Sequence, residues 1–203
     1  MGQLKIKRGK YYSILVLCIV TVLFTSSCKS QEKLEFSDLK TALEKKEEVV
    51  ILKIRNESEY KSFPLEIYDL LNLETLSFTG SDCDIRNNDC INIDKIPDGI
   101  ENLSKLKELY LVMNNIKSLT DGINSLNNLK VLDLSNNTSI NLDNLNNESI
   151  ETLNLNECYL SNLPKFLYKM KNLKTLGLEG NNIEESEIEE LQKKLPKCKI
   201  YWQ

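Results

Sequence analysis

A nine-residue phrase, L-x-x-L-x-L-x-x-N, returns along this chain at a nearly fixed interval, and it constrains the fold more than any other feature. Copies of the phrase, some with other aliphatic residues, begin at Val49, Leu73, Leu106, Leu129, Ile150, Leu173 and Leu195. The steps between successive starts are 24, 33, 23, 21, 23 and 22 residues. A period in the twenties predicts one small structural unit per copy, and stacked neighbours would bury a common core.

Each copy changes its hydrophobic period along its length. The L-x-L segment alternates apolar and free positions, which predicts a short strand with leucines inward and x residues outward. The segments between copies carry apolar residues at wider spacing, and a proline recurs there at Pro64, Pro97 and Pro164. Proline tolerates the first turn of a helix, so these segments predict short helical or 3₁₀ legs behind the strands.

The phrase and its spacing resemble those of leucine-rich-repeat proteins over about 150 residues. The resemblance implies an α/β fold, a curved leucine-rich-repeat solenoid with about seven parallel strands on its concave face. Short helical or 3₁₀ legs would line the convex face. We expect the repeat domain to cover residues 37–203, with capping helices within 37–48 and 184–203, because a solenoid exposes the core of its end repeats. Ser37 is the expected N-cap of the first helix.

The residue that closes the phrase is expected to be structural. Asn114, Asn137 and Asn181 should turn inward and hydrogen-bond backbone groups that would otherwise be buried without partners. Cys158 holds the same position, which predicts a buried thiol. Cys198 replaces an inward leucine one intervening repeat away, about 10 Å at the usual strand spacing. A disulfide needs Cα atoms within about 7 Å, so these two cysteines should not pair.

The first 27 residues predict a signal peptide. A basic stretch without acids is followed by an apolar run, Ile14 to Phe24, and then by the small residues Thr25, Ser26 and Ser27 before Cys28. The apolar run is shorter than the roughly 20 residues that a membrane-spanning helix needs.

The segment that ends at Cys28 resembles the lipoprotein box of bacteria. Ser26, Ser27 and Cys28 fit that box, whereas Thr25 stands where it prefers leucine. The resemblance implies a lipidated Cys28, a tether over residues 28–36 and a lipid-anchored protein of the cell envelope. Lys29 in place of aspartate favours the outer membrane. The alternative is ordinary cleavage nearby, which leaves Cys28 a free thiol.

The step of 33 residues marks an insertion that contains two cysteines. The excess length lies near residues 82–92, and it contains Cys83 and Cys90. An exported protein favours oxidation, so we expect these two residues to form a disulfide. One alternative is a calcium site, with oxygen ligands from Asp82, Asp84, Asn87, Asn88 and Asp89. The other alternative is a solvated loop without a ligand. We expect this insertion to bind no metal.

Composition argues against catalysis and against nucleic-acid binding. The chain has no histidine, which removes the commonest general base and the commonest zinc ligand. It also lacks a glycine-rich phosphate loop, so no cofactor is expected. Without residues 1–27, 22 basic residues face 30 acidic ones, and a net charge near −8 disfavours nucleic acid. We therefore expect no enzyme. An enzyme that uses carboxylates is a remote alternative.

The free x positions of the strands are the candidate binding surface. Tyr110, Val112 and Val131 are apolar residues among otherwise polar x positions, and an exposed tyrosine beside aliphatic residues is typical of an interface anchor. The candidate partner-binding residues are Arg55, Glu108, Tyr110, Val112, Val131, Asp133 and Asn154. The expected function is that of a monomeric module that binds a protein partner. The alternative is a surface-exposed adhesin or a structural protein of the envelope.

Lipidation of Cys28 is directly testable. When the full chain is expressed in a bacterium with labelled palmitate, we expect the wild type to incorporate the label. Cys28→Ala should lose it, because the acyl chains would be attached to that thiol and to the new N-terminus. Cys18→Ala is the matched control and should keep the label. Label that persists in Cys28→Ala contradicts the prediction.

Overall fold

The computed structural model describes residues 34–57, 59–81, 92–138 and 140–203. Residues 34–203 form one compact unit. The predicted signal peptide, Cys28 and the Cys83–Cys90 pair lie outside the described residues, and so do the proposed calcium ligands.

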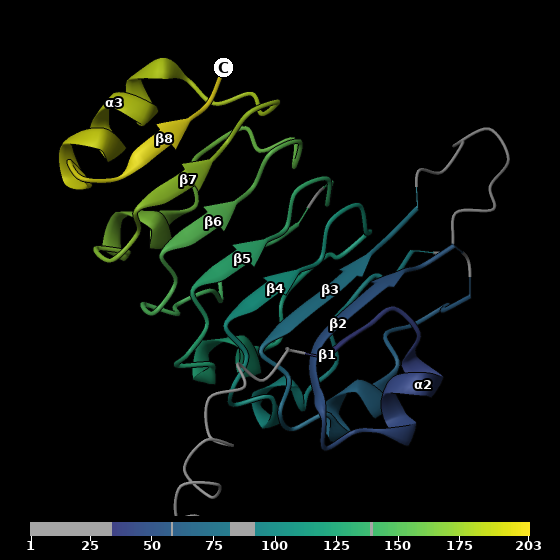
Figure 1. Cartoon of the computed structure of the whole chain (residues 1–203). Coiled ribbons are helices and arrows are strands. Elements are labelled where there is room, and N and C mark those ends of the chain that lie inside the picture. The colour runs from purple at the N-terminus through teal and green to yellow at the C-terminus, as the bar shows by residue number, and fades with distance from the viewer. Residues whose placement is uncertain (1–33, 58, 82–91, 139) are drawn as a thin grey trace, which may run out of the picture. The chain divides into compact units, whose positions relative to one another are not determined.

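The described residues form one eight-stranded sheet whose strands follow each other in chain order (Figure 1). Every neighbouring pair is parallel. The strands are β1 (Leu34–Phe36), β2 (Val49–Arg55), β3 (Thr75–Thr79), β4 (Glu108–Tyr110), β5 (Val131–Asp133), β6 (Thr152–Asn154), β7 (Thr175–Gly177) and β8 (Lys199–Tyr201). Each copy of the phrase supplies one of them, from β2 to β8, and β1 is an additional strand.

The strand register aligns the leucines of successive copies into one continuous core. The residues in line across the sheet are Leu52, Leu76, Leu109, Leu132, Leu153, Leu176 and Ile200. The six leucines are fully buried, and Ile200 at the end of the sheet is partly buried. Alternate x residues lie on the other face, because side chains of a strand point to opposite faces in turn. The predicted alternation is confirmed.

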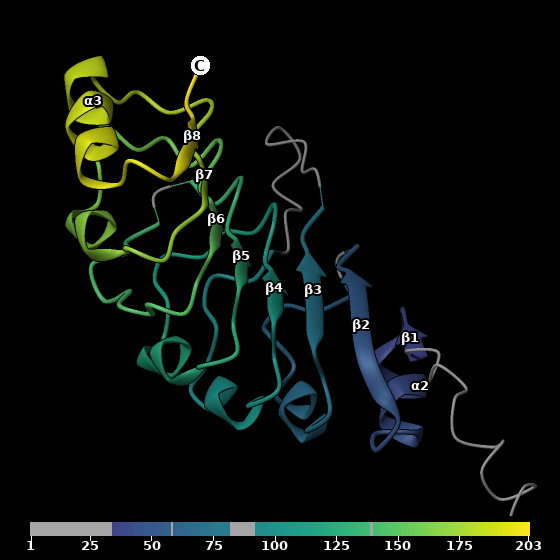
Figure 2. The same cartoon turned by 60° about the vertical axis from the view of Figure 1, so that its left-hand side comes forward.

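Within the described residues, short 3₁₀ turns lie in four of the connections between strands. They are η1 (Leu65–Asp69), η2 (Ile100–Asn102), η3 (Asp121–Ser125) and η4 (Lys165–Lys169). Pro64 and Pro164 are the N-caps of η1 and η4, as the recurring prolines predict, whereas Gly99 and not Pro97 is the N-cap of η2. Figure 2 shows the curved stack edge-on, with the connecting legs along the outer side of the strands. The sheet therefore forms the concave face.

One α-helix lies near each end of the sheet. Helix α2 (Leu39–Glu44) begins after Asp38, whose side chain accepts a hydrogen bond from the Thr41 backbone N–H at 2.7 Å. The predicted N-cap, Ser37, was therefore wrong by one residue, because Asp38 has the extended backbone of an N-cap and its carboxylate accepts from the first turn. Helix α3 (Glu185–Lys194) has glutamates in its first turn and lysines in its last. That the two helices act as caps stays a prediction.

The segment expected to be a polar tether is partly structured. Residues 34–36 of the predicted 28–36 tether form β1, which pairs with β2 from Leu34 to Phe36. The sequence did not indicate this strand, because it lies outside the repeated phrase and has no leucine pattern of its own. The sheet therefore has eight strands instead of the expected seven.

The asparagines that close the phrase hydrogen-bond the backbone, as predicted. Asn137 Nδ2 donates to the carbonyls of Leu111 and Leu134, each at 2.8 Å, and Asn137 Oδ1 accepts from the Ile116 N–H at 3.0 Å. Asn181 makes the same bonds two copies further along the chain, to the carbonyls of Leu155 and Leu178 at 2.8 Å. Each side chain therefore ties its own turn to the preceding copy.

Cys158 and Asn114 depart from this hydrogen-bond pattern, and the sequence differs at or next to each of them. Cys158 is buried, and its thiol lies 3.3 Å from the Leu134 carbonyl, so it retains one contact of the asparagine that it replaces. Cys158 and Cys198 are both free thiols, as expected. Asn114 Oδ1 is the one buried side-chain oxygen or nitrogen without a hydrogen-bond partner among the described residues. It follows the step of 33 residues, where the preceding copy departs from the period.

We expect Asn137→Ala to destabilise the fold by about 1–3 kcal/mol, because it leaves the buried Ile116 N–H without its acceptor. It also removes one of the two donors that each of the Leu111 and Leu134 carbonyls has. Asn162→Ala is the matched control, since Asn162 is exposed and hydrogen-bonds Ser161 Oγ. Urea unfolding followed by circular dichroism measures both variants. Equal midpoints for the two variants would remove the structural role assigned to this asparagine.

Candidate functional site

The x residues form three parallel rows across the concave face. The first row is Ile51, Thr75, Glu108, Val131, Thr152, Thr175 and Lys199, and the second is Lys53, Ser77, Tyr110, Asp133, Asn154, Gly177 and Tyr201. Main-chain hydrogen bonds beyond the strands add a third row, from Thr79 through Val112, Ser135 and Asn156 to Glu179. The face is thus a broad, mostly polar surface built from every repeat.

A chain of side-chain hydrogen bonds fixes the polar groups of β5 to β7. Asp133 accepts from the Ser135 hydroxyl at 2.6 Å and from Asn154 Nδ2 at 3.0 Å. Asn154 Oδ1 then accepts from the Asn156 N–H at 3.0 Å, and Asn156 Nδ2 donates to Glu179 Oε2 at 3.0 Å. These contacts hold the side chains in defined rotamers, so a partner would meet a surface that is already ordered.

Tyr110 lies in the middle of the face, beside a carboxylate. Its hydroxyl donates to Glu108 Oε2 at 3.3 Å, and Thr75 Oγ1 donates to the same oxygen at 3.3 Å. Burial and the nearby Glu108 carboxylate raise the pKa of Tyr110 above its ordinary value. Tyr110 therefore stays a neutral donor at physiological pH, with part of its ring open to solvent.

A small hollow lies at the N-terminal part of the face. Lys53, Arg55, Ser77 and Thr79 line it with Ile54, Gly80 and Met113, and its volume is about 340 Å³. Lys53 pairs with Glu35 at 2.9 Å and Arg55 with Glu57 at 3.5 Å. All four ion-paired side chains are at least half exposed, so these pairs contribute little to the stability of the fold. A carboxylate of a partner can therefore replace Glu35 or Glu57 beside Lys53 or Arg55.

The structure places all seven predicted binding residues on the concave side. It does not make Tyr110 and Val131 direct neighbours, because Val131 is in register with Glu108 and Tyr110 is in register with Asp133. The expected apolar patch is therefore a diagonal set of separated side chains. Sequence reasoning missed the hollow at Lys53 and Thr79, although aligning the x residues of successive copies would have placed these side chains on adjacent strands.

Neither described cysteine is a candidate nucleophile. Burial raises the pKa of the Cys158 thiol to about 11, and it raises that of Cys198 to about 11 as well. A nucleophilic cysteine needs a lowered pKa, because the thiolate is the reactive form. Within the described ranges, no three His, Cys, Asp or Glu side chains gather closely enough to hold a metal ion. The same ranges contain no helix with the length and apolar character to cross a membrane.

Solved structures with this architecture exist, although no family model and no curated protein matches the sequence. A leucine-rich-repeat protein of Leptospira interrogans is 31% identical over 76% of this chain and 44% of its own, with a TM-score of 0.53. The plant peptide hormone receptor RGFR1, in complex with RGF2, is 23% identical over 84% of this chain and 31% of its own, also with a TM-score of 0.53.

The chain is a leucine-rich-repeat protein. The repeated phrase and the parallel sheet in chain order agree with the leucine-rich-repeat fold of these neighbours. This leucine-rich-repeat chain spans less than half of the length of either solved structure. The likeness to the plant receptor concerns the fold alone, and the lipoprotein assignment of the N-terminus stays a prediction.

The buried thiol of Cys158 predicts a loss of stability in alkali. Its pKa rises from 9.0 to about 11 on folding, so its contribution is complete below pH 9 and disappears as the pH rises through 11. The loss should be about 2–3 kcal/mol. Cys158→Asn restores the asparagine of the pattern and removes this titration. We expect its melting temperature to fall less than that of the wild type between pH 9 and 11. Identical pH profiles for the two proteins would contradict this assignment.

Proposed function

We propose that this leucine-rich-repeat protein is a non-enzymatic, lipid-anchored binding module of the bacterial cell envelope that recognises a protein partner through its concave face. The observation that carries the proposal is the ordered polar network from Asp133 to Glu179, next to the half-exposed Tyr110. Broad surfaces with fixed polar groups and an aromatic residue suit a protein ligand better than a small substrate.

The charges of the face indicate the chemistry of the partner. Lys53 and Arg55 lie on β2, whereas Glu108, Asp133 and Glu179 lie on or after β4, β5 and β7. An extended segment that crosses the strands would place an acidic group in the hollow beside Arg55. Donors or basic groups of the same segment would face Asp133 and Glu179. Complementary charges of this kind set orientation and specificity.

The solved peptide hormone receptor in complex with RGF2 supports the proposal as an example of a leucine-rich-repeat protein with a bound partner. The absence of histidine in the sequence and the raised thiol pKa values further favour binding over catalysis. The adhesin alternative has no observation of its own in its favour.

Lipidation at Cys28 would set the position of the binding face. Five residues, 29–33, separate Cys28 from the start of β1 at Leu34. Even fully extended, they reach about 20 Å. The N-terminal repeats would then be held close to the membrane to which the protein is anchored. The outer membrane is the proposed location, and the partner would be a protein of the same envelope.

The binding face is tested by capture from envelope extracts with the wild type and a concave double variant, Tyr110→Ala with Val112→Ser. We expect the double variant to lose the captured partner, since it removes the anchor at the centre of the face. Purified partner and isothermal titration calorimetry should then show affinity weakened at least tenfold. Lys53→Glu with Arg55→Glu should also weaken binding, and this loss should come with a smaller salt dependence.

The matched control is Leu65→Ser with Leu71→Ser. These leucines are 57% and 56% exposed and lie on the leg behind the sheet, so the control removes two apolar side chains from the other face. We expect this control to bind like the wild type. Capture that is unchanged in the concave variant, or lost only in the control, contradicts a concave binding site.

A further inference from the structure

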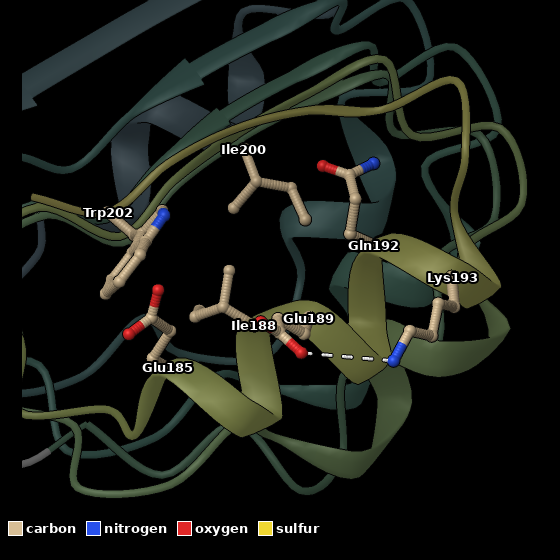
Figure 3. A pocket seen from close by; sticks show the side chains of 7 residues that line it. All are labelled: Glu185, Ile188, Glu189, Gln192, Lys193, Ile200 and Trp202. Atoms are coloured by element: carbon tan, nitrogen blue, oxygen red, sulfur yellow. Dashed lines mark ion pairs between the residues drawn. The ribbon is translucent and has the colours of Figure 1, made fainter.

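An apolar groove lies at the C-terminal end of the repeat stack, away from the binding face (Figure 3). Its floor consists of Ile188 from α3 and of Ile200 and Trp202 from the last strand and the residue after it. Its volume is about 400 Å³. Figure 3 shows the three apolar side chains grouped together, with polar side chains of α3 around them: Glu185, Glu189, Gln192 and Lys193.

The groove runs along an unpaired edge of the described sheet. Strand β8 is the last in the strand order and pairs with β7 on one side. An edge strand presents backbone donors and acceptors to any strand that approaches, unless the protein covers it. The polar positions Lys199 and Tyr201 flank Ile200 on this strand, and both are exposed. The edge and the apolar groove together offer backbone hydrogen bonds and buried area to the same partner.

The charges on α3 are complementary to those of a second, antiparallel α3. The first turn of the helix contains Glu185 and Glu187, and the last contains Lys193 and Lys194. A two-fold axis near the middle of the helix would bring Glu185 of one copy beside Lys193 of the other. Glu189 lies at that axis and would face its own copy, and its ion pair with Lys193 at 3.9 Å offsets part of the repulsion between the two carboxylates. That pair is well exposed, so Lys193 can also interact with a second carboxylate.

We propose that the occupant of this groove is a second copy of the chain, in a two-fold dimer formed by α3 and β8. A two-fold interface must be self-complementary, because the same patch meets itself, and the charge order of α3 has that property. The apolar floor of each copy would cover that of the other, and the two β8 edges would face each other. This dimer replaces the monomer expected from the sequence, and it leaves both concave faces free to bind partners.

The association is measured by sedimentation equilibrium on residues 28–203 with Cys28→Ser, since residues 34–203 form a compact unit with its own core. We expect a reversible dimer that predominates at about 100 μM protein, in keeping with a small interface. Trp202 is the single tryptophan of the chain, so its fluorescence reports on the groove directly. Its emission should shift to shorter wavelength as the protein concentration rises and the groove becomes covered.

Charge exchange identifies the interface. Glu185→Lys and Lys193→Glu should each weaken the dimer at least tenfold, because each places like charges opposite each other. Both changes in one chain should restore it, since the exchanged charges again face their opposites. Glu148→Lys is the matched control, because Glu148 is an exposed glutamate outside α3 and β8, and it should dimerise like the wild type. Circular dichroism checks that every variant is folded.

Two results would overturn the proposal. One is a wild type that remains a monomer at 100 μM with constant Trp202 emission. The other is a dimer whose affinity is the same in both single charge variants, which would place the contact elsewhere on the molecule. The concave variants Tyr110→Ala and Val112→Ser lie outside this interface and should leave the dimer unchanged. The proposal of a dimer and the proposal of a concave binding face are therefore tested independently.

Discussion

The hydrogen bonds between the closing asparagines and the backbone are the interaction on which the rest of this structure depends. Where each short strand ends, the chain turns sharply, and the carbonyls of that turn have no strand partner. Asn137 satisfies carbonyls of two successive copies and also accepts from an N–H of the earlier one. A leucine in that place would leave the buried Ile116 N–H without an acceptor, at a cost of about 1–3 kcal/mol, and would remove one donor from each of the two carbonyls. The contact ties successive copies together wherever an asparagine closes the phrase, at Asn114, Asn137 and Asn181.

The same constraint explains where the repeat tolerates change. Cys158 keeps one contact to the Leu134 carbonyl and buries a small apolar thiol, so the ladder continues through it. At the long step, Asn92 takes over a similar task. Its side chain accepts from the Ser81 N–H at 3.1 Å and so holds together the two ends of the inserted segment. Asn114 Oδ1 lacks a partner next to this departure from the period.

The leucines and asparagines of the phrase serve the scaffold. Binding specificity therefore depends on the residues at the positions that the repeated pattern does not fix. On the concave face these residues form an ordered polar network with cations near its N-terminal part and carboxylates beyond. At the C-terminal end of the stack, residues of this kind form an apolar groove beside α3, whose first turn is acidic and whose last turn is basic. The two surfaces have different chemistry. The polar face suits a specific partner of opposite charge pattern, and the end suits a copy of itself.

The sequence by itself determined the fold and the face that carries the candidate site. The alternation of apolar and polar residues predicts that Leu109 is buried and that Tyr110 faces solvent. Because the phrase recurs, it also predicts that the solvent-facing residues of all copies lie on one face of the sheet. These are local properties of a strand, so they are readable along the chain. The thiols of Cys158 and Cys198 were placed correctly for the same reason.

Tertiary structure decided what depends on register and on the ends of the stack. Whether Val131 lies beside Glu108 or Tyr110 follows from the pairing of β4 with β5, and no single copy of the phrase contains that information. Strand β1 forms because a free edge of β2 offers it backbone partners, so its own residues carry no signal. The groove at Trp202 likewise exists because the packing of α3 and β8 leaves their outer sides uncovered, a property of the assembled end rather than of any local pattern.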